Sequence, residues 1–157
     1  MWTWIDKKKA GWVKRRMEQE QIRIEIQEAI DAADRALRSL ERARDSLHSA
    51  KGWGVLDMLG GGLFSTWFKH SNMDEAEKAL ANAQTALKDF SRELGDVGET
   101  IDLNFNNADL LTVADYFLDG FFTDFLMQGR INDAITNVEG TIDQVTAIRN
   151  ALRQKLL

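Results

Sequence analysis

Apolar residues recur at steps of four and three along the first third of the chain. Between residues 10 and 50 they are Ile26, Ile30, Ala33, Leu37, Leu40 and Leu47, with the small residues Ala29, Ala36 and Ala43 beside them. This spacing places them on one face of an α-helix and is typical of a coiled-coil seam. Arg23 and Arg44 interrupt the seam, so it is not a simple leucine zipper. We therefore predict a helix over residues 10–50 whose apolar face packs against other helices.

A second amphipathic segment begins near Ser71. Serine is a good N-cap residue, and Asp74 follows three positions later, as in a short capping box. The apolar positions then keep a helical spacing as Ala76, Leu80, Ala83, Leu87, Phe90 and Leu94. Glycine commonly ends helices, and Gly95 follows directly. The pattern predicts a helix from Ser71 to Gly95.

The remainder of the chain predicts one extended segment and two more helices. Residues 95–107 include the alternating run TIDLNF, which favours extended backbone. Asn106 or Asn107 would cap a third helix of about residues 109–128, which is rich in aromatic side chains. Gly129 would break the chain before a fourth helix, whose seam is Ile131, Ile135, Val138, Ile142, Val145, Ile148, Leu152 and Leu156.

These elements predict an all-α fold in a single domain of residues 1–157. The long first, second and fourth helices would form an elongated antiparallel bundle. The Gly-rich residues 52–70 and the short aromatic helix would form an apolar cap at one end. At 1.5 Å per residue the first helix is about 60 Å long, against about 35 Å and 40 Å for its partners. Residues 1–22 would then form a protruding arm rich in basic residues and Trp, whose exposed apolar side chains need cover.

Composition supports this fold and restricts the partners. The chain has no proline and no cysteine, which favours helices and removes disulfides and thiol chemistry. Its net charge of −5 divides unevenly, from +3 through Lys51 to −8 from Gly52 onward. A largely acidic body argues against nucleic-acid binding, which requires a continuous basic surface. The partners that we expect are a second copy of the chain or another helical protein, with a membrane surface as a weaker alternative.

No segment is predicted to cross a membrane. Residues 53–68 are too short and include Asp57, and residues 110–127 contain three aspartates, each costing about 2.5–3.5 kcal/mol at a bilayer centre. The first residues, MWTWIDKKKAGW, lack the apolar core of a secretory signal. We therefore expect a cytoplasmic protein.

Two segments carry a resemblance to other proteins. They are LDMLGGGLFSTWFKHSNMDEA (56–76) and YFLDGFFTDFLMQGRINDA (116–134). They resemble uncharacterised bacterial all-helical proteins with an Asp, Gly-Gly-Gly-Leu, Lys-His pattern and a later Asp, Phe, Asp, Arg-Ile pattern. Leu56 departs from the aromatic residue that this group carries before the aspartate. The resemblance implies a helical fold and no particular activity.

The glycine triplet is the first candidate site. It is not a P-loop, because no Gly-Lys-Ser/Thr follows it. One hypothesis is a nest of backbone N–H groups that binds an anion or small ligand at a helix start. Its residues would be Gly60, Gly61, Gly62, Ser65, Thr66, Lys69, His70 and Asp124. The other hypothesis, which we favour, is a tight packed connection in which glycine allows close approach of the backbone.

Asp124 is the second candidate, because it lies at the edge of the apolar face of the third helix. A carboxylate there needs a partner, so we expect a structural ion pair with Lys69, His70 or Arg130. Metal binding is not expected, since the chain has two histidines, His48 and His70, without the paired motifs of a di-iron bundle. No cofactor is predicted, and no nucleophile elbow marks a catalytic serine.

The function predicted from these patterns is that of a non-catalytic interaction or scaffold protein, self-associating through its coiled-coil-like seam. The first alternative is a peripheral membrane-surface protein that uses the Trp/Lys/Arg N-terminus. The second is a small-ligand or anion-binding protein, or an enzyme, centred on the glycine triplet and Asp124.

Overall fold

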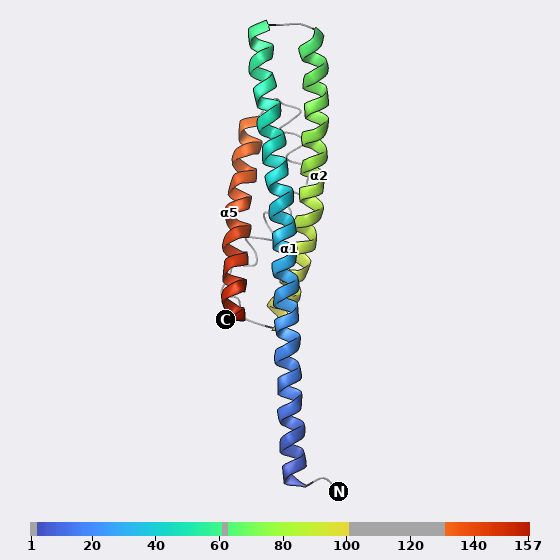
Figure 1. Ribbon diagram of the computed structural model, residues 1–157, viewed down its shortest axis with the longest axis vertical. Helices are drawn as coiled ribbons and strands as arrows, with labels where there is room; N and C mark the ends of the chain where they lie inside the picture. The colour runs from blue at the N-terminus through green and yellow to red at the C-terminus, as the bar shows by residue number, and fades with distance from the viewer. Residues whose placement is uncertain (1–2, 61–62, 101–130) are drawn as a thin grey trace.

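The computed structural model describes the backbone of residues 3–60, 63–100 and 131–157, and the side chains of residues 3–50, 74–98 and 131–157. Three helices make up this part of the chain: α1 (Trp4–Gly60), α2 (Leu63–Thr100) and α5 (Ile131–Leu156) (Figure 1). The prediction of an all-α fold is confirmed. The predicted aromatic helix of residues 109–128 and its Asn caps lie outside the described residues.

Helix α1 begins earlier than the apolar pattern predicts. Its 57 residues correspond to about 85 Å of helix. Thr3 is the N-cap: its hydroxyl accepts a hydrogen bond from the Asp6 N–H (3.3 Å), and the Asp6 carboxylate accepts one from the Thr3 N–H (3.1 Å). This reciprocal capping box satisfies N–H groups that have no partner within the helix. The helix therefore starts at Trp4 rather than near residue 10.

The two helix boundaries predicted at Ser71 and Gly95 are wrong, because both residues lie inside α2. Leu94 and Val97 are buried on either side of Gly95, while Gly95 itself faces solvent. Packing of the flanking apolar residues therefore carries the helix past the glycine, and residues 95–100 are helical rather than extended. The backbone of the Gly-rich stretch is helical up to Gly60 and again from Leu63.

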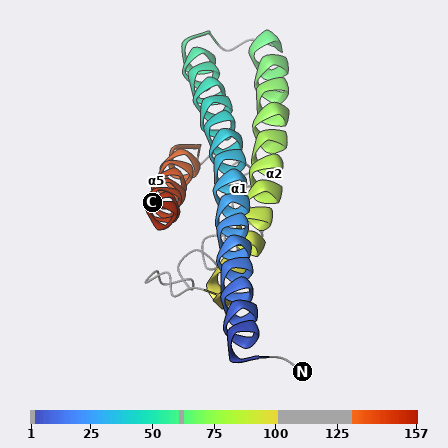
Figure 2. The same ribbon diagram turned by 60° about the horizontal axis from the view of Figure 1, so that its bottom comes forward.

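Helix α1 is the central element of the described chain. It packs against both α2 and α5, and each of these runs in the direction opposite to α1 (Figures 1 and 2). The N-terminal part of α1 extends beyond the ends of α2 and α5 (Figure 1). None of the described helices has a stretch that is both long and apolar enough to traverse a lipid bilayer.

The core follows a seven-residue repeat in all three helices. In α1 the buried residues alternate at steps of three and four: Ile26, Ala29, Ala33, Ala36, Leu40, Ala43, Leu47 and Ala50. The same steps recur in α2 as Ala76, Leu80, Ala83, Leu87, Phe90, Leu94 and Val97, and in α5 as Ala134, Val138, Thr141, Val145, Ile148 and Leu152. A mean period of 3.5 residues is that of helices that wind around one another with a left-handed twist. Ile30 and Leu37 of α1 are buried as well, because α1 contacts two helices at once.

Candidate interaction surface

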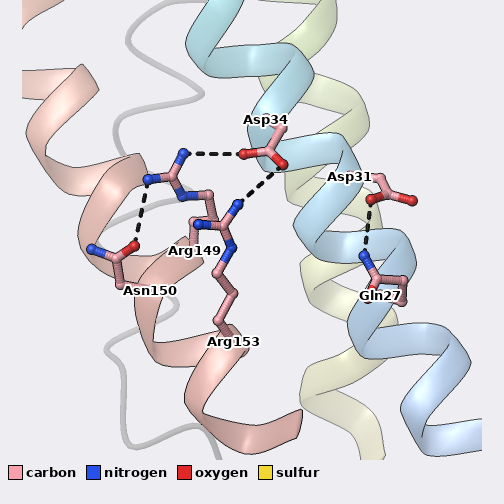
Figure 3. Close-up of polar contacts among 6 residues, drawn as sticks. All are labelled: Gln27, Asp31, Asp34, Arg149, Asn150 and Arg153. Atoms are coloured by element: carbon pink, nitrogen blue, oxygen red, sulfur yellow. Dashed lines mark hydrogen bonds and ion pairs between the residues drawn. The ribbon is translucent and has the colours of Figure 1, made fainter.

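A polar cluster joins α1 to the C-terminal turns of α5 (Figure 3). The carboxylate of Asp34 accepts a hydrogen bond from Arg149 Nη1 over 3.1 Å and lies 3.5 Å from Arg153 Nη2. Asp34 and Arg149 are partly buried, with side chains 29% and 22% exposed. Each of these residues follows directly after a core residue, at the rim of the helix contact. One carboxylate held by two guanidinium groups links α1 to α5 at this position.

Two further contacts tie the same helices together. Arg23 Nη1 donates to the backbone carbonyl of Leu156 over 3.4 Å, and His48 Nε2 lies 3.6 Å from the Glu139 carboxylate. Arg23 thus interrupts the apolar seam where it meets the end of α5. Among the described side chains, no group of three metal-ligating residues comes together.

The sequence-predicted ligand site falls largely outside the described residues. Gly60 is the last residue of α1, and the backbone of Ser65, Thr66, Lys69 and His70 lies in the first turns of α2. The side chains of these four residues lie outside the described part. So do Gly61, Gly62, Asp124 and Arg130, together with the predicted ion pair and apolar cap. The anion site and the pairing of Asp124 both stay predictions.

The candidate interaction surface is the N-terminal part of α1 with its cap, residues 3–21, which we call the arm. Large apolar side chains are exposed there, with Trp4 72%, Trp12 62% and Met17 69% accessible. One basic group lies over a face of each indole ring: Lys8 Nζ is 4.4 Å from the ring centre of Trp4, and Arg16 Cζ is 5.4 Å from that of Trp12. These cation–π contacts contribute about 0.5–1 kcal/mol each at exposed sites. They leave most of each ring in water.

The apolar residues of the arm, together with Ile24 just beyond it, form two stripes. Ile5 and Trp12 continue the seven-residue register of core residue Ile26, with Gln19 in the intervening position. The second stripe consists of Ala10, Val13, Met17 and Ile24. At 100° per residue, Met17 and Ile24 lie roughly opposite Ile26, on the face of α1 turned away from the core. Ile24 is accordingly 45% exposed, whereas Ile26 is 2% exposed.

The surface of the arm is shallow and open rather than deeply concave. A shallow hollow runs along the second stripe, lined by Lys9, Val13, Lys14 and Met17 among others, all from α1. A hollow on one helix has no opposite wall, so it cannot enclose a ligand in the way that a binding cleft does. It can accept side chains from another helix or surface.

Charge is unevenly distributed along α1. Residues 3–16 contain six basic residues and one acidic residue, for a net charge of +5. Residues 17–28 contain four glutamates and one arginine, for a net charge of −3. The junction of these basic and acidic halves lies at Met17, in the middle of the second stripe.

Comparison with known proteins gives no family for this chain. No protein-family model, curated protein or solved structure matches it. The resemblance of residues 56–76 and 116–134 to uncharacterised bacterial helical proteins stays an expectation.

Proposed function

We propose that this protein is a non-catalytic interaction or scaffold protein that self-associates through α1. The observation that carries the proposal is the arm, a helical extension with Trp4, Trp12 and Met17 exposed in one chain. Exposed apolar side chains concentrated in one helical segment are characteristic of protein or membrane interaction sites. The rigid body of the bundle would hold this segment clear of the rest of the molecule.

Only part of α1 is left uncovered by the other described helices of the same chain. Core residues from Ile26 to Ala50 are already covered by α2 and α5 of the same chain. A second copy would therefore use apolar residues of the arm rather than the seam of the body. This modifies the expectation from sequence, in which the seam as a whole was the association surface.

Sedimentation equilibrium of the full chain tests self-association directly. We expect a dimer or higher oligomer at tens of micromolar. A monomer at that concentration would contradict the proposal. A matched pair of substitutions locates the surface: Met17→Glu in the arm should lower the apparent mass, whereas Glu75→Gln on the exposed face of α2 should leave it unchanged.

Binding to a membrane surface is the second candidate function. It is favoured by the indole rings of Trp4 and Trp12 lying beneath Lys8 and Arg16, since Trp and basic residues together suit the headgroup region. The glutamates of residues 17–28 oppose it, because they would face anionic lipid. We expect weak, salt-sensitive flotation with anionic vesicles and none with neutral ones. Tight binding to neutral vesicles at physiological salt would reverse the ranking of the two candidates.

The cap of the bundle and the cellular setting of the protein are part of the same proposal. We propose that residues 52–70 and the predicted aromatic helix cap the elongated antiparallel bundle at the end away from the arm. We also propose a cytoplasmic setting, which a chain without cysteine suits. A small-ligand or anion-binding site, or an enzyme site, at Gly60–Gly62 with Lys69, His70 and Asp124 remains the third candidate.

A further inference from the structure

We propose that two copies of this chain associate by packing their arms in antiparallel orientation, crossing near Met17. This inference rests on the proposed self-association and specifies its geometry. The two bodies would then lie at opposite ends of a long, two-stranded helical stem.

The first argument is the position of the second apolar stripe. Ala10, Met17 and Ile24 repeat at steps of seven, with Val13 between the first two. They lie on the face of α1 opposite core residue Ile26, so a second helix can approach them without displacing α2 or α5. The stripe ends at Asp31, the next position in the series, which hydrogen-bonds with Gln27 on the surface. Its length is thus confined to the arm and the first turns beyond it.

The second argument is charge complementarity. A parallel arrangement would place two segments of net charge +5 side by side, and two of −3 next to them. An antiparallel arrangement places residues 3–16 of each chain, of net charge +5, beside residues 17–28 of the other, of net charge −3. The opposite charges then attract each other. Because the arms are exposed to solvent, this attraction acts through water and salt weakens it. Charge therefore selects the antiparallel orientation.

Glu20 gives a third, more local argument. It occupies the one position of the stripe between Met17 and Ile24 that is not apolar. In a parallel, in-register pair, the two copies of Glu20 would face each other at this position, which is destabilising. In an antiparallel pair crossing at Met17, each Glu20 instead lies opposite the other chain's segment Lys14–Arg16. The same pattern disfavours an anionic lipid surface as the occupant, because the glutamates would be repelled by it.

A charge exchange in the full chain tests the orientation. Lys14→Glu with Arg16→Glu should raise the dimer dissociation constant about tenfold or more, and Glu18→Lys with Glu20→Lys should do the same. All four substitutions together should restore it to within about threefold, because complementarity returns. Lys78→Glu with Lys88→Glu, at exposed positions of α2, is the control for total charge and should have little effect. Circular dichroism confirms that each variant keeps its helices.

A second measurement uses the absence of cysteine, which allows a spin label to be placed at one chosen position. With the arms crossing at Met17, labels at Lys7→Cys should lie about 30 Å apart along the stem, and labels at Glu18→Cys close together. Short distances at both positions, about the 10 Å spacing of packed helices, would establish a parallel dimer and overturn the inference. A dimer whose affinity neither charge pair changes would also overturn it while leaving self-association intact. A monomer that floats with anionic vesicles would overturn both proposals.

Discussion

The carboxylate of Asp34 accepts a 3.1 Å hydrogen bond from the guanidinium of Arg149, a residue 115 positions later in the chain. The pair lies at the rim of the α1–α5 contact, and Arg153 approaches the other carboxylate oxygen. It brings the last helix into a fixed register on the first, since a shift of either helix by one residue would separate the groups. Apolar heptads alone accept several registers, whereas a polar pair accepts one.

Removing Asp34 should therefore cost more than removing its outer partner. Asp34→Ala leaves the partly buried Arg149 without its carboxylate partner and with only the weaker contact to the Asn150 side chain, and among the described residues the Nε of Arg149 is already buried without a hydrogen bond. We expect a loss of about 1–2 kcal/mol in urea unfolding. Arg153→Ala, at a 3.5 Å contact with an exposed side chain, should cost less than about 0.5–1 kcal/mol. Equal, small losses for both variants would show that solvent screens the Asp34–Arg149 pair as well.

Ile24 and Ile26 lie on opposite faces of α1: Ile26 is in the core and Ile24 is exposed. Ile26→Asp buries a carboxylate among apolar side chains of α1 and its neighbours and should cost about 3–5 kcal/mol. Ile24→Asp should change the free energy of unfolding of the monomer by less than about 1 kcal/mol, because Ile24 is 45% exposed. If the antiparallel stem exists, Ile24→Asp should instead weaken the dimer. Urea unfolding at low protein concentration and sedimentation equilibrium measure the two effects separately.

The sequence predicted the apolar faces because their spacing is a local property of each helix. Residues such as Leu40 and Leu87, placed on buried faces by the steps of three and four, are in the core. Helix ends were less predictable, because Ser71 and Gly95 act as caps only where packing ceases, and α2 continues to pack on both sides of Gly95. The start at Trp4 could have been found from the Thr3-x-x-Asp6 spacing, which is a capping box with Asp in place of Glu.

The polar contacts between helices could not be predicted in the same way. Asp34, Arg149 and Arg153 are ordinary surface residue types, and only the relative register of α1 and α5 brings them together. The arm was predicted from the greater length of the first helix. The two stripes on the arm could be told apart only from the structure, because the buried residues show which face of α1 packs against α2 and α5.

Gly95 offers a direct test of the helix that runs through it. A Cβ built at Gly95 or at Gly140 meets nothing within 4 Å, and both residues are helical and exposed. Gly95→Ala and Gly140→Ala should each stabilise the protein by about 0.5–1 kcal/mol, because alanine loses less backbone freedom on folding. Thermal unfolding at one protein concentration measures the change. A marked destabilisation by Gly95→Ala would mean that the helix ends there in a left-handed glycine cap, as the sequence alone predicted.

The capping box at the start of α1 should respond to pH. Hydrogen bonds from the Thr3 hydroxyl (2.6 Å) and the Thr3 N–H lower the pKa of Asp6 below its ordinary value. A carboxyl group with a lower pKa in the folded state stabilises the helix above its unfolded pKa. That contribution is lost as the pH falls through the folded pKa, when the carboxylate gains a proton. The first turn of α1 should therefore fray in acid before the core unfolds, and the amides of Asp6 and Lys7, which are bonded to Thr3, should exchange faster. Thr3→Ala should return the pKa of Asp6, followed by NMR titration, toward its ordinary value, whereas Lys14→Ala farther along the arm should leave it in place. An Asp6 that titrates normally in the unaltered chain would mean that α1 begins later, as its apolar pattern alone indicates.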